Sequence, residues 1–250
     1  MKKACINSYG NSSLFEFSEL ILNAPLGSKD IKINVKATSV NPIDVMKREG
    51  YGKSIFEKQR KELFPWVLGT DVTGTILEIG DKVTRFNVGQ DVWGASTNPN
   101  RGTYCDVAFF HEDELDIKPT NLSFQEAAAL PYAAITTWSA LVRWAGLRPH
   151  DIENKKVFIQ GGSGGIGTYA IQLFKNLGCY VATTCSHKNL DLLEDIGADE
   201  VINYETTNFQ EILSEYNIVY DLLGGDQEKN CIDILTNNNS SHYITLVHPF

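Results

Sequence analysis

The sequence predicts an α/β protein in which a doubly wound parallel sheet, residues 126–250, follows an all-β domain, residues 1–125. Three observations support this fold class. Short strands with glycine turns fill the first half, and apolar strands alternate with helices in the second. The first strand of the second half also ends in a glycine-rich turn, residues 161–167, which is typical of nucleotide-binding sheets.

The first half predicts a series of short strands. Ile31, Ile33 and Val35 alternate with polar residues, so that strand has one face in solvent. Glycine turns between strands of this length indicate a small barrel or Greek-key domain. The expected strands are residues 1–6, 31–37, 69–80, 91–93 and 102–110.

Helices connect the two halves. Ser123 and Glu126 have the spacing of a capping box, which opens a helix over residues 124–130. Pro131 is expected to interrupt this helix, and the apolar pattern resumes over residues 135–144. We expect these helices to lead from the β domain to the nucleotide domain.

The second half begins with a strand, a glycine turn and a helix. Val157–Ile159 is a short apolar run, as in a buried parallel strand, and a helix is expected over residues 169–177 with Gly178 just after its end. Such a turn brings backbone N–H groups close to a pyrophosphate, and the helix N-terminus adds its positive end. Glycine turns also serve plain strand–helix packing, but the elements that follow favour the nucleotide interpretation. The candidate cofactor-binding residues of the turn are Gly161, Ser163, Gly164, Gly165, Ile166 and Gly167.

Strands and helices alternate through the rest of the chain. Thr207 and Gln210 have the spacing of a further capping box, with Phe209, Ile212 and Leu213 expected to face inward. The expected strands are residues 180–184, 201–204, 218–222 and 243–247, with a helix over residues 190–196.

The loop after the second strand of this half bears on cofactor choice. An NAD site places Asp or Glu about 20 residues beyond the glycines, to bind the ribose hydroxyls. This chain has Ser186 and Lys188 there, a hydroxyl and a cation that suit a 2′-phosphate, and no carboxylate to repel it. The sequence therefore favours NADPH over NADH, with an ordinary polar loop as the alternative.

Composition limits the classes of function. Of the 250 residues, 42% are hydrophobic and 21% charged, as in ordinary globular proteins. A net charge of -9 argues against nucleic acid as a partner. Five cysteines without a CxxC pair fit free thiols in a reducing compartment, and neither a disulfide framework nor structural zinc. The first residues show neither a secretory h-region nor an Arg-rich transit pattern.

Several segments are similar to those of a known enzyme family. Together with the glycine turn, a first set resembles the zinc-free quinone oxidoreductase branch of the medium-chain dehydrogenase/reductase superfamily, which pairs a GroES-like barrel with a Rossmann domain. These segments are Val40–Asp44, Gly69–Asp71, Ala127–Pro131 and Thr137–Trp138. A second set looks most like the reticulon-interacting mitochondrial members of that branch: Ser39–Val45, Gly50–Gly52, Leu130–Tyr132 and Tyr243–Phe250.

The resemblance implies roles for single residues. Asn41 and Tyr51 would line the pocket for substrate and nicotinamide, and Thr137 would meet the nicotinamide carboxamide. Tyr204 would lie near the 2′-phosphate or the adenine. The alternatives are turn chemistry before Pro42 for Asn41, a bond to its own helix backbone for Thr137, and a core position for Tyr204.

The resemblance also implies a function. It is hydride transfer from NADPH to a quinone or other activated carbonyl, in support of coenzyme Q metabolism. A 2-enoyl thioester reductase, or an NADPH-binding mitochondrial interaction protein with little turnover, stays open as an alternative. The resemblance further implies a mitochondrial location (with the cytoplasm as alternative), a reticulon-type membrane protein as partner, and a homodimer for the full-length protein.

Two departures from the family matter. Zinc-dependent relatives carry His where Thr70 stands, Cys near Asn41, and a four-Cys lobe where this chain runs directly from Trp93 to Gly102, so we expect no zinc site. Relatives also continue with a sixth strand and a segment that completes the β domain, whereas this sequence ends at Phe250. We therefore expect a truncated chain with an incomplete Rossmann sheet, and its native activity is in question.

Overall fold

The chain divides into two compact units, Met1–Tyr132 (unit 1) and Ala133–Phe250 (unit 2). The computed structural model describes residues 1–19, 25–59, 64–96, 98, 101–238 and 240–247. The domain boundary expected after residue 125 stays a prediction. No helix in the described part of the chain is long and apolar enough to cross a membrane.

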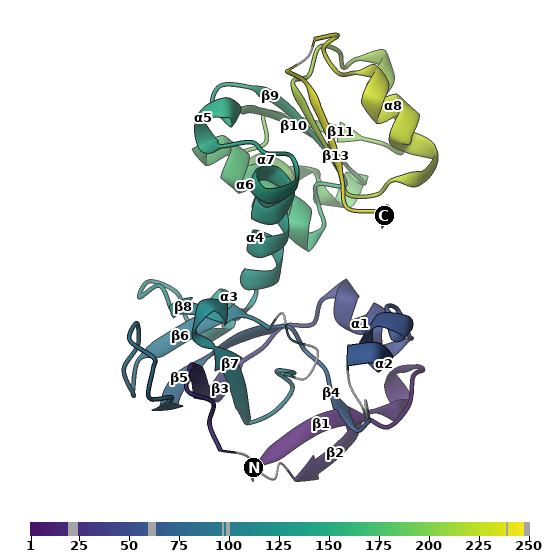
Figure 1. The fold of residues 1–250 in the computed structure, drawn as a ribbon. Coiled ribbons are helices and arrows are strands. Elements are labelled where there is room, and N and C mark those ends of the chain that lie inside the picture. Colours follow the sequence, from purple (N-terminus) through teal and green to yellow (C-terminus); the bar gives the residue numbers. More distant parts are fainter. Residues whose placement is uncertain (20–24, 60–63, 97, 99–100, 239, 248–250) are drawn as a thin grey trace. The chain divides into compact units, whose positions relative to one another are not determined.

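Unit 1 contains two antiparallel sheets (Figure 1). One has five strands in the order β7-β3-β5-β6-β8, and the other has three in the order β2-β1-β4. This arrangement confirms the predicted all-β half. The bounds are β1 Lys2–Ile6, β2 Glu16–Glu19, β3 Asp30–Ala37, β4 Trp66–Val67, β5 Asp71–Ile79, β6 Asp91–Ala95, β7 Val107–His111 and β8 Leu115–Ile117.

The core of unit 1 follows the predicted alternation. Ile31 and Ile33 of β3 are buried and pack with Ile76 and Phe110 from the neighbouring strands. The strand expected over residues 102–110 is shorter than predicted. Its first part forms a turn instead, because the N–H groups of residues 103 and 104 both donate to the carbonyl oxygen of residue 68.

Short helices complete unit 1 and begin unit 2. They are α1 Pro42–Arg48, α2 Lys53–Gln59, α3 Phe124–Ala128 and α4 Pro131–Trp138. The capping box is confirmed, because Ser123 Oγ accepts from Glu126 N–H at 3.2 Å. The expected interruption at Pro131 is confirmed, because α3 ends at Ala128. The second helix begins at Pro131 itself rather than at residue 135, since proline is the first residue of α4, a position where a missing N–H costs no helical bond. α4 continues directly into a π-helical segment, Ser139–Trp144.

Unit 2 contains one parallel sheet with the strand order β11-β10-β9-β12-β13 (Figure 1). β10 and β11 lie on one side of β9, and the chain then returns to form β12 and β13 on the other side of β9. This order confirms the predicted doubly wound sheet. The strands are β9 Lys156–Gln160, β10 Tyr180–Cys185, β11 Glu200–Asn203, β12 Ile218–Asp221 and β13 His242–Thr245, and the α-helices after α4 are α5 Pro149–Ile152, α6 Gly165–Asn176, α7 Leu190–Asp195 and α8 Glu228–Asp233.

Both faces of this sheet are covered by apolar side chains. Val157 and Ile159 of β9 pack in a core that includes Phe174 of α6. Phe158, between them, points to the other face, where its ring stacks on Phe209 with the centroids 4.8 Å apart. The apolar run of this strand is continuous because each face has its own core.

Three local predictions for unit 2 need correction. α6 begins at Gly165 rather than at residue 169. The predicted capping box at Thr207 is absent from the described contacts of that turn; the cap is Asn208, whose Oδ1 accepts from Gln210 N–H at 3.4 Å. Ile212, expected to face inward, is 52% exposed. In the motif Tyr243–Phe250, residues 248–250 lie outside the described residues.

Candidate functional site

The glycine turn stands between β9 and α6, in the middle of the parallel sheet. β9 lies between β10 and β12, so the turn is at the point where the chain order reverses, which is where doubly wound sheets bind ligands. β10 fixes the turn, because Gly162 N–H donates to Thr184 O at 3.2 Å and Gly161 N–H to Thr184 Oγ1 at 3.3 Å. Gly161 has a φ of +85°, a conformation that favours glycine. Half-buried Ser163 lies within the same turn.

Two glycines of this segment are required by packing. A Cβ added at Gly162 would lie 2.0 Å from Thr183 Oγ1, and one at Gly167 would lie 2.5 Å from the carbonyl oxygen of Gly161. The second contact is to backbone, so no side-chain rotation could relieve it. Close packing of the turn against β10 explains the glycine at position 162, and close packing of α6 on the turn explains the glycine at position 167.

Gly165 has no such explanation. A Cβ there would meet nothing within 4 Å, and its φ is not in the left-handed region. The N–H groups of Gly165, Ile166 and Gly167 also precede the first intrahelical bond, which Thr168 N–H donates to Gly164 O at 2.8 Å. Open space beside N–H groups without intrahelical acceptors fits the pyrophosphate of a dinucleotide.

The remaining predicted cofactor residues, Ser186, Lys188 and Tyr204, follow the ends of two neighbouring strands, β10 and β11. Cys185, the last residue of β10, pairs with Asn203, the last residue of β11. Ser186, Lys188 and Tyr204 therefore follow at the same edge of the sheet as the glycine turn. Tyr204 is 60% exposed, so its alternative interpretation as a core residue is wrong.

Glu205 is a residue that the sequence analysis missed. Its Oε2 accepts a hydrogen bond from His187 N–H at 3.0 Å. The expectation that no carboxylate stands at this loop is therefore wrong, because the acid comes from the end of β11 and not from the end of β10. The available signal was an acid directly after the third strand of the second half.

Thr137 lies in α4 and is fully buried, at 0% exposure. Its Oγ1 has no hydrogen-bond partner among the described residues. The alternative in which this hydroxyl bonds to its own helix backbone is therefore wrong. A buried hydroxyl without a partner costs about 1–3 kcal/mol, and a ligand that accepts its hydrogen bond would remove that cost.

In unit 1, a buried carboxylate holds Asn41. The Asn41 Nδ2 atom donates to Asp71 Oδ2 at 2.8 Å and to Ser39 Oγ at 3.0 Å. Asp71 also accepts from Tyr132 N–H at 2.6 Å. Burial raises the pKa of Asp71, and these hydrogen bonds oppose that rise. Asp71 is thus a structural carboxylate, which fixes the orientation of the Asn41 amide.

A second buried acid of unit 1, Asp44, accepts hydrogen bonds from two side chains. Thr70 Oγ1 donates to Asp44 Oδ1 at 2.8 Å, and Tyr104 OH donates to Asp44 Oδ2 at 3.2 Å. Thr70 and Asn41 supply neither thiolate nor imidazole, and both are bonded to carboxylates. In the described ranges, no group of three or more His, Cys, Asp or Glu side chains could hold a metal ion. The residues present do not fit a zinc ion.

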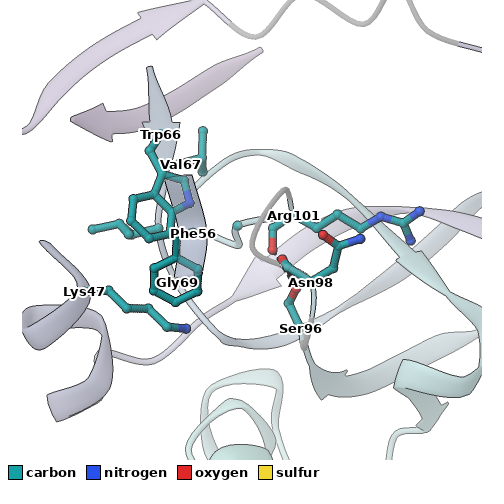
Figure 2. A pocket seen from close by; sticks show the side chains of 10 residues that line it. Lys47, Phe56, Trp66, Val67, Gly69, Ser96, Asn98 and Arg101 are labelled. Atoms are coloured by element: carbon teal, nitrogen blue, oxygen red, sulfur yellow. Dashed lines mark hydrogen bonds between the residues drawn. The ribbon is translucent and has the colours of Figure 1, made fainter. Parts of the chain in front are cut away.

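Tyr51 lies between α1 and α2 with its side chain 47% exposed. A pocket of unit 1 has Lys47 and Trp66 on one side and Ser96 and Arg101 on the other (Figure 2). Its volume of about 40 Å³ suits a water molecule and not a quinone ring. Neither of the two predicted catalytic residues of unit 1 is among its lining residues.

Two family descriptions match the chain. The alcohol dehydrogenase GroES-like domain covers residues 27–137, and the zinc-binding dehydrogenase covers residues 165–248. The chain therefore belongs to the medium-chain dehydrogenase/reductase superfamily, as its motifs predicted.

The relatives give this assignment detail. The chain is 35% identical to "NAD(P)H oxidoreductase RTN4IP1, mitochondrial" of Danio rerio, over 98% of this chain and 66% of that protein. It is 32% identical to the protein of the same name from Dictyostelium discoideum, over 94% of this chain and 69% of that one. The structure of the quinone oxidoreductase from Coxiella burnetii matches with a TM-score of 0.82 and 32% identity, over 94% of this chain and 73% of that chain. The chain thus spans about two thirds of the length of these curated relatives.

Proposed function

We propose that this chain is an NADPH-dependent oxidoreductase that transfers a hydride to a quinone or another activated carbonyl without zinc. Gly165 carries the proposal, because neither its conformation nor its packing requires glycine, whereas a bound pyrophosphate would. The names of the relatives, an NAD(P)H oxidoreductase and a quinone oxidoreductase, support the same class of reaction.

Residues of unit 2 would hold the cofactor. The N–H groups of Ile166 and Gly167 bind the pyrophosphate, the hydroxyl of Ser186 and the ammonium of Lys188 bind the 2′-phosphate, and the hydroxyl of Thr137 donates to the carboxamide. When bound, NADPH supplies the hydride. Exposed Tyr204 offers a ring to the adenosine portion.

Residues of unit 1 would position the substrate. Hydride transfer needs chiefly a ring held flat against the nicotinamide in a site that excludes water. Asn41 suits such a role, because Asp71 fixes its amide before any ligand binds. Tyr51 is the proposed proton source for the oxygen anion of the product, with solvent as the other source.

The test of this proposal is Gly165→Ala. An added methyl group meets no protein atom, so the free energy of unfolding should stay the same or rise by up to about 1 kcal/mol. The same methyl group occupies the proposed pyrophosphate space, so the Kd for NADPH should rise roughly tenfold or more. Fluorescence titration and chemical denaturation measure the two quantities.

Gly167→Ala is the matched control. Its methyl group meets backbone, so this variant should lose stability as well as binding. The proposal fails if Gly165→Ala binds NADPH as tightly as the unchanged protein does. Turnover of NADPH with a panel of quinones and enoyl-CoA thioesters then separates the proposed reaction from the alternative reductase, and tight binding without turnover would favour an interaction protein.

We also propose a mitochondrial location, because the relatives carry that word in their names. Immunofluorescence against a mitochondrial marker in the source cells tests it, and a diffuse cytoplasmic signal would contradict it. A reticulon-type partner, a homodimer and a part in coenzyme Q metabolism stay predictions from resemblance.

A further inference from the structure

Glu205 stands at the carboxyl edge of the unit 2 sheet, in the turn after β11, whereas the ribose-binding acid of an NAD site follows the second strand, here β10. β10 and β11 run side by side, with Cys185 paired to Asn203 (Figure 1). Tyr204 N–H donates to Cys185 O at 3.1 Å, which extends the pairing by one residue. Glu205 is the next residue, so it lies beside the loop that follows β10.

Two hydrogen bonds hold Glu205 in this place. Its own N–H donates to Asn203 Oδ1 at 3.0 Å, which fixes the turn after β11. Its Oε2 accepts from His187 N–H at 3.0 Å. His187 directly follows Ser186, so the carboxylate lies across the loop that is predicted to receive the 2′-phosphate.

The carboxylate and a 2′-phosphate have conflicting needs. A phosphate monoester carries about −1.5 to −2 charges at neutral pH, and its oxygens chiefly accept hydrogen bonds. Glu205 also only accepts when ionised, so the two groups repel and compete for the N–H of His187. A ribose hydroxyl can instead donate to the carboxylate, as it does to the acid of an NAD site. Lys188, on the same loop, has the opposite preference, because its ammonium attracts the phosphate.

We propose that Glu205 is a cofactor-specificity residue, which opposes Lys188 and narrows the preference for NADPH over NADH. The inference rests on the proposed function, because it concerns the same cofactor site. Its chemistry is that of the missing acid of the second strand, supplied by the neighbouring strand. A chain with both groups would accept both cofactors, with the balance set by one cation and one anion.

The experiment compares Glu205→Gln with the unchanged 250-residue chain. Glutamine keeps an oxygen that accepts from His187 N–H, so the loop should stay folded while the charge is removed. NADPH and NADH are titrated separately, and the ratio of the two Kd values isolates the 2′-phosphate. We expect the preference for NADPH to increase roughly twofold to fivefold, as one solvent-exposed charge contact would give.

Asp233→Asn is the matched control, because it removes one exposed carboxylate from α8. The residue after it, Ile234, accepts from Tyr216 N–H ahead of β12, at the amino edge of the sheet. This variant should leave the ratio unchanged.

The possible outcomes distinguish failure of the specificity role of Glu205 from failure of the proposed function. The inference is overturned if the ratio of the two Kd values in Glu205→Gln equals that of the unchanged chain, or if it shifts in favour of NADH. In either case, binding of NADPH by the unchanged chain still supports the cofactor assignment. If the unchanged chain binds neither cofactor, the proposed function fails and the inference fails with it. Thermal denaturation of each variant shows whether a lost affinity reflects unfolding, and repetition at higher ionic strength should shrink the effect of an electrostatic contact.

Discussion

Removal of the Thr137 hydroxyl should stabilise the free protein and weaken its cofactor binding. The side chain is fully buried and its Oγ1 has no partner among the described residues, so the folded chain bears the cost of an unsatisfied polar group. Valine has nearly the same shape without that group. Thr137→Val should therefore raise the free energy of unfolding by about 1–3 kcal/mol. For a chain of this length, each kcal/mol corresponds to roughly 2–4 °C in Tm.

The same substitution should have the opposite effect on the complex. In the proposed site, the hydroxyl of Thr137 donates to the carboxamide of the cofactor, and a net contribution of about 0.5–1.5 kcal/mol is ordinary for such a bond. The Kd for NADPH should rise roughly twofold to tenfold. Thr137→Ser keeps the hydroxyl and should keep most of the affinity.

Thr183 offers a matched control within the same unit. It is also fully buried, but its Oγ1 donates to Ile159 O at 2.8 Å. Thr183→Val should lower the free energy of unfolding, because a satisfied hydrogen bond is lost. Urea denaturation with and without NADPH measures all three variants. If Thr137→Val destabilises the free protein as Thr183→Val does, the hydroxyl of Thr137 has a protein partner and the reasoning is wrong.

Two further predictions concern unit 1. Burial raises the pKa of Asp71, so the folded state holds the proton more tightly than the unfolded state does. The contribution of this group to the free energy of unfolding therefore falls as the pH rises above its ordinary pKa of 3.8. Asp71→Asn should lack that fall when urea midpoints are compared across pH. A wild-type stability curve parallel to that of the variant would contradict this cause. Because Thr70 and Asn41 are poor zinc ligands, turnover should survive dialysis against a chelator, and activity that returns only with added zinc would contradict the zinc-free assignment.

The architecture was predictable because its signals are local. In unit 2, the run Val157–Ile159 and the glycines that follow it carry the strand and the turn in their own composition. Gly178, with a φ of +75°, ends α6 where a glycine was expected. The helix start at Gly165 and the cap at Asn208 were harder, because each depends on which of several adjacent residues makes the first hydrogen bond.

The edge of the unit 2 sheet that carries the proposed cofactor residues was predictable only in part. Ser186 and Lys188 directly follow a strand with a clear sequence pattern, so their position at the edge of the sheet could be predicted from the local sequence. Glu205 belongs to the same loop surface only because β11 pairs with β10 in one register, Cys185 opposite Asn203. The pairing between strands decides which side chains come close together, and this pairing cannot be predicted from the spacing of residues along the sequence. The burial of Thr137 and the lack of a partner for its hydroxyl likewise depend on packing.

The buried acids of unit 1 fix the orientation of two neutral side chains, those of Thr70 and Asn41. Asp44 and Asp71 are both buried, at 3% and 0% exposure. A buried carboxylate needs donors, and here neutral groups supply them: Thr70 Oγ1 donates to Asp44, and Asn41 Nδ2 donates to Asp71. The same bonds that satisfy the acids also fix the side chains of Thr70 and Asn41. In the proposed function, the fixed amide and hydroxyl dipoles would orient the substrate, which suits hydride transfer to an acceptor that is already activated and needs no Lewis acid.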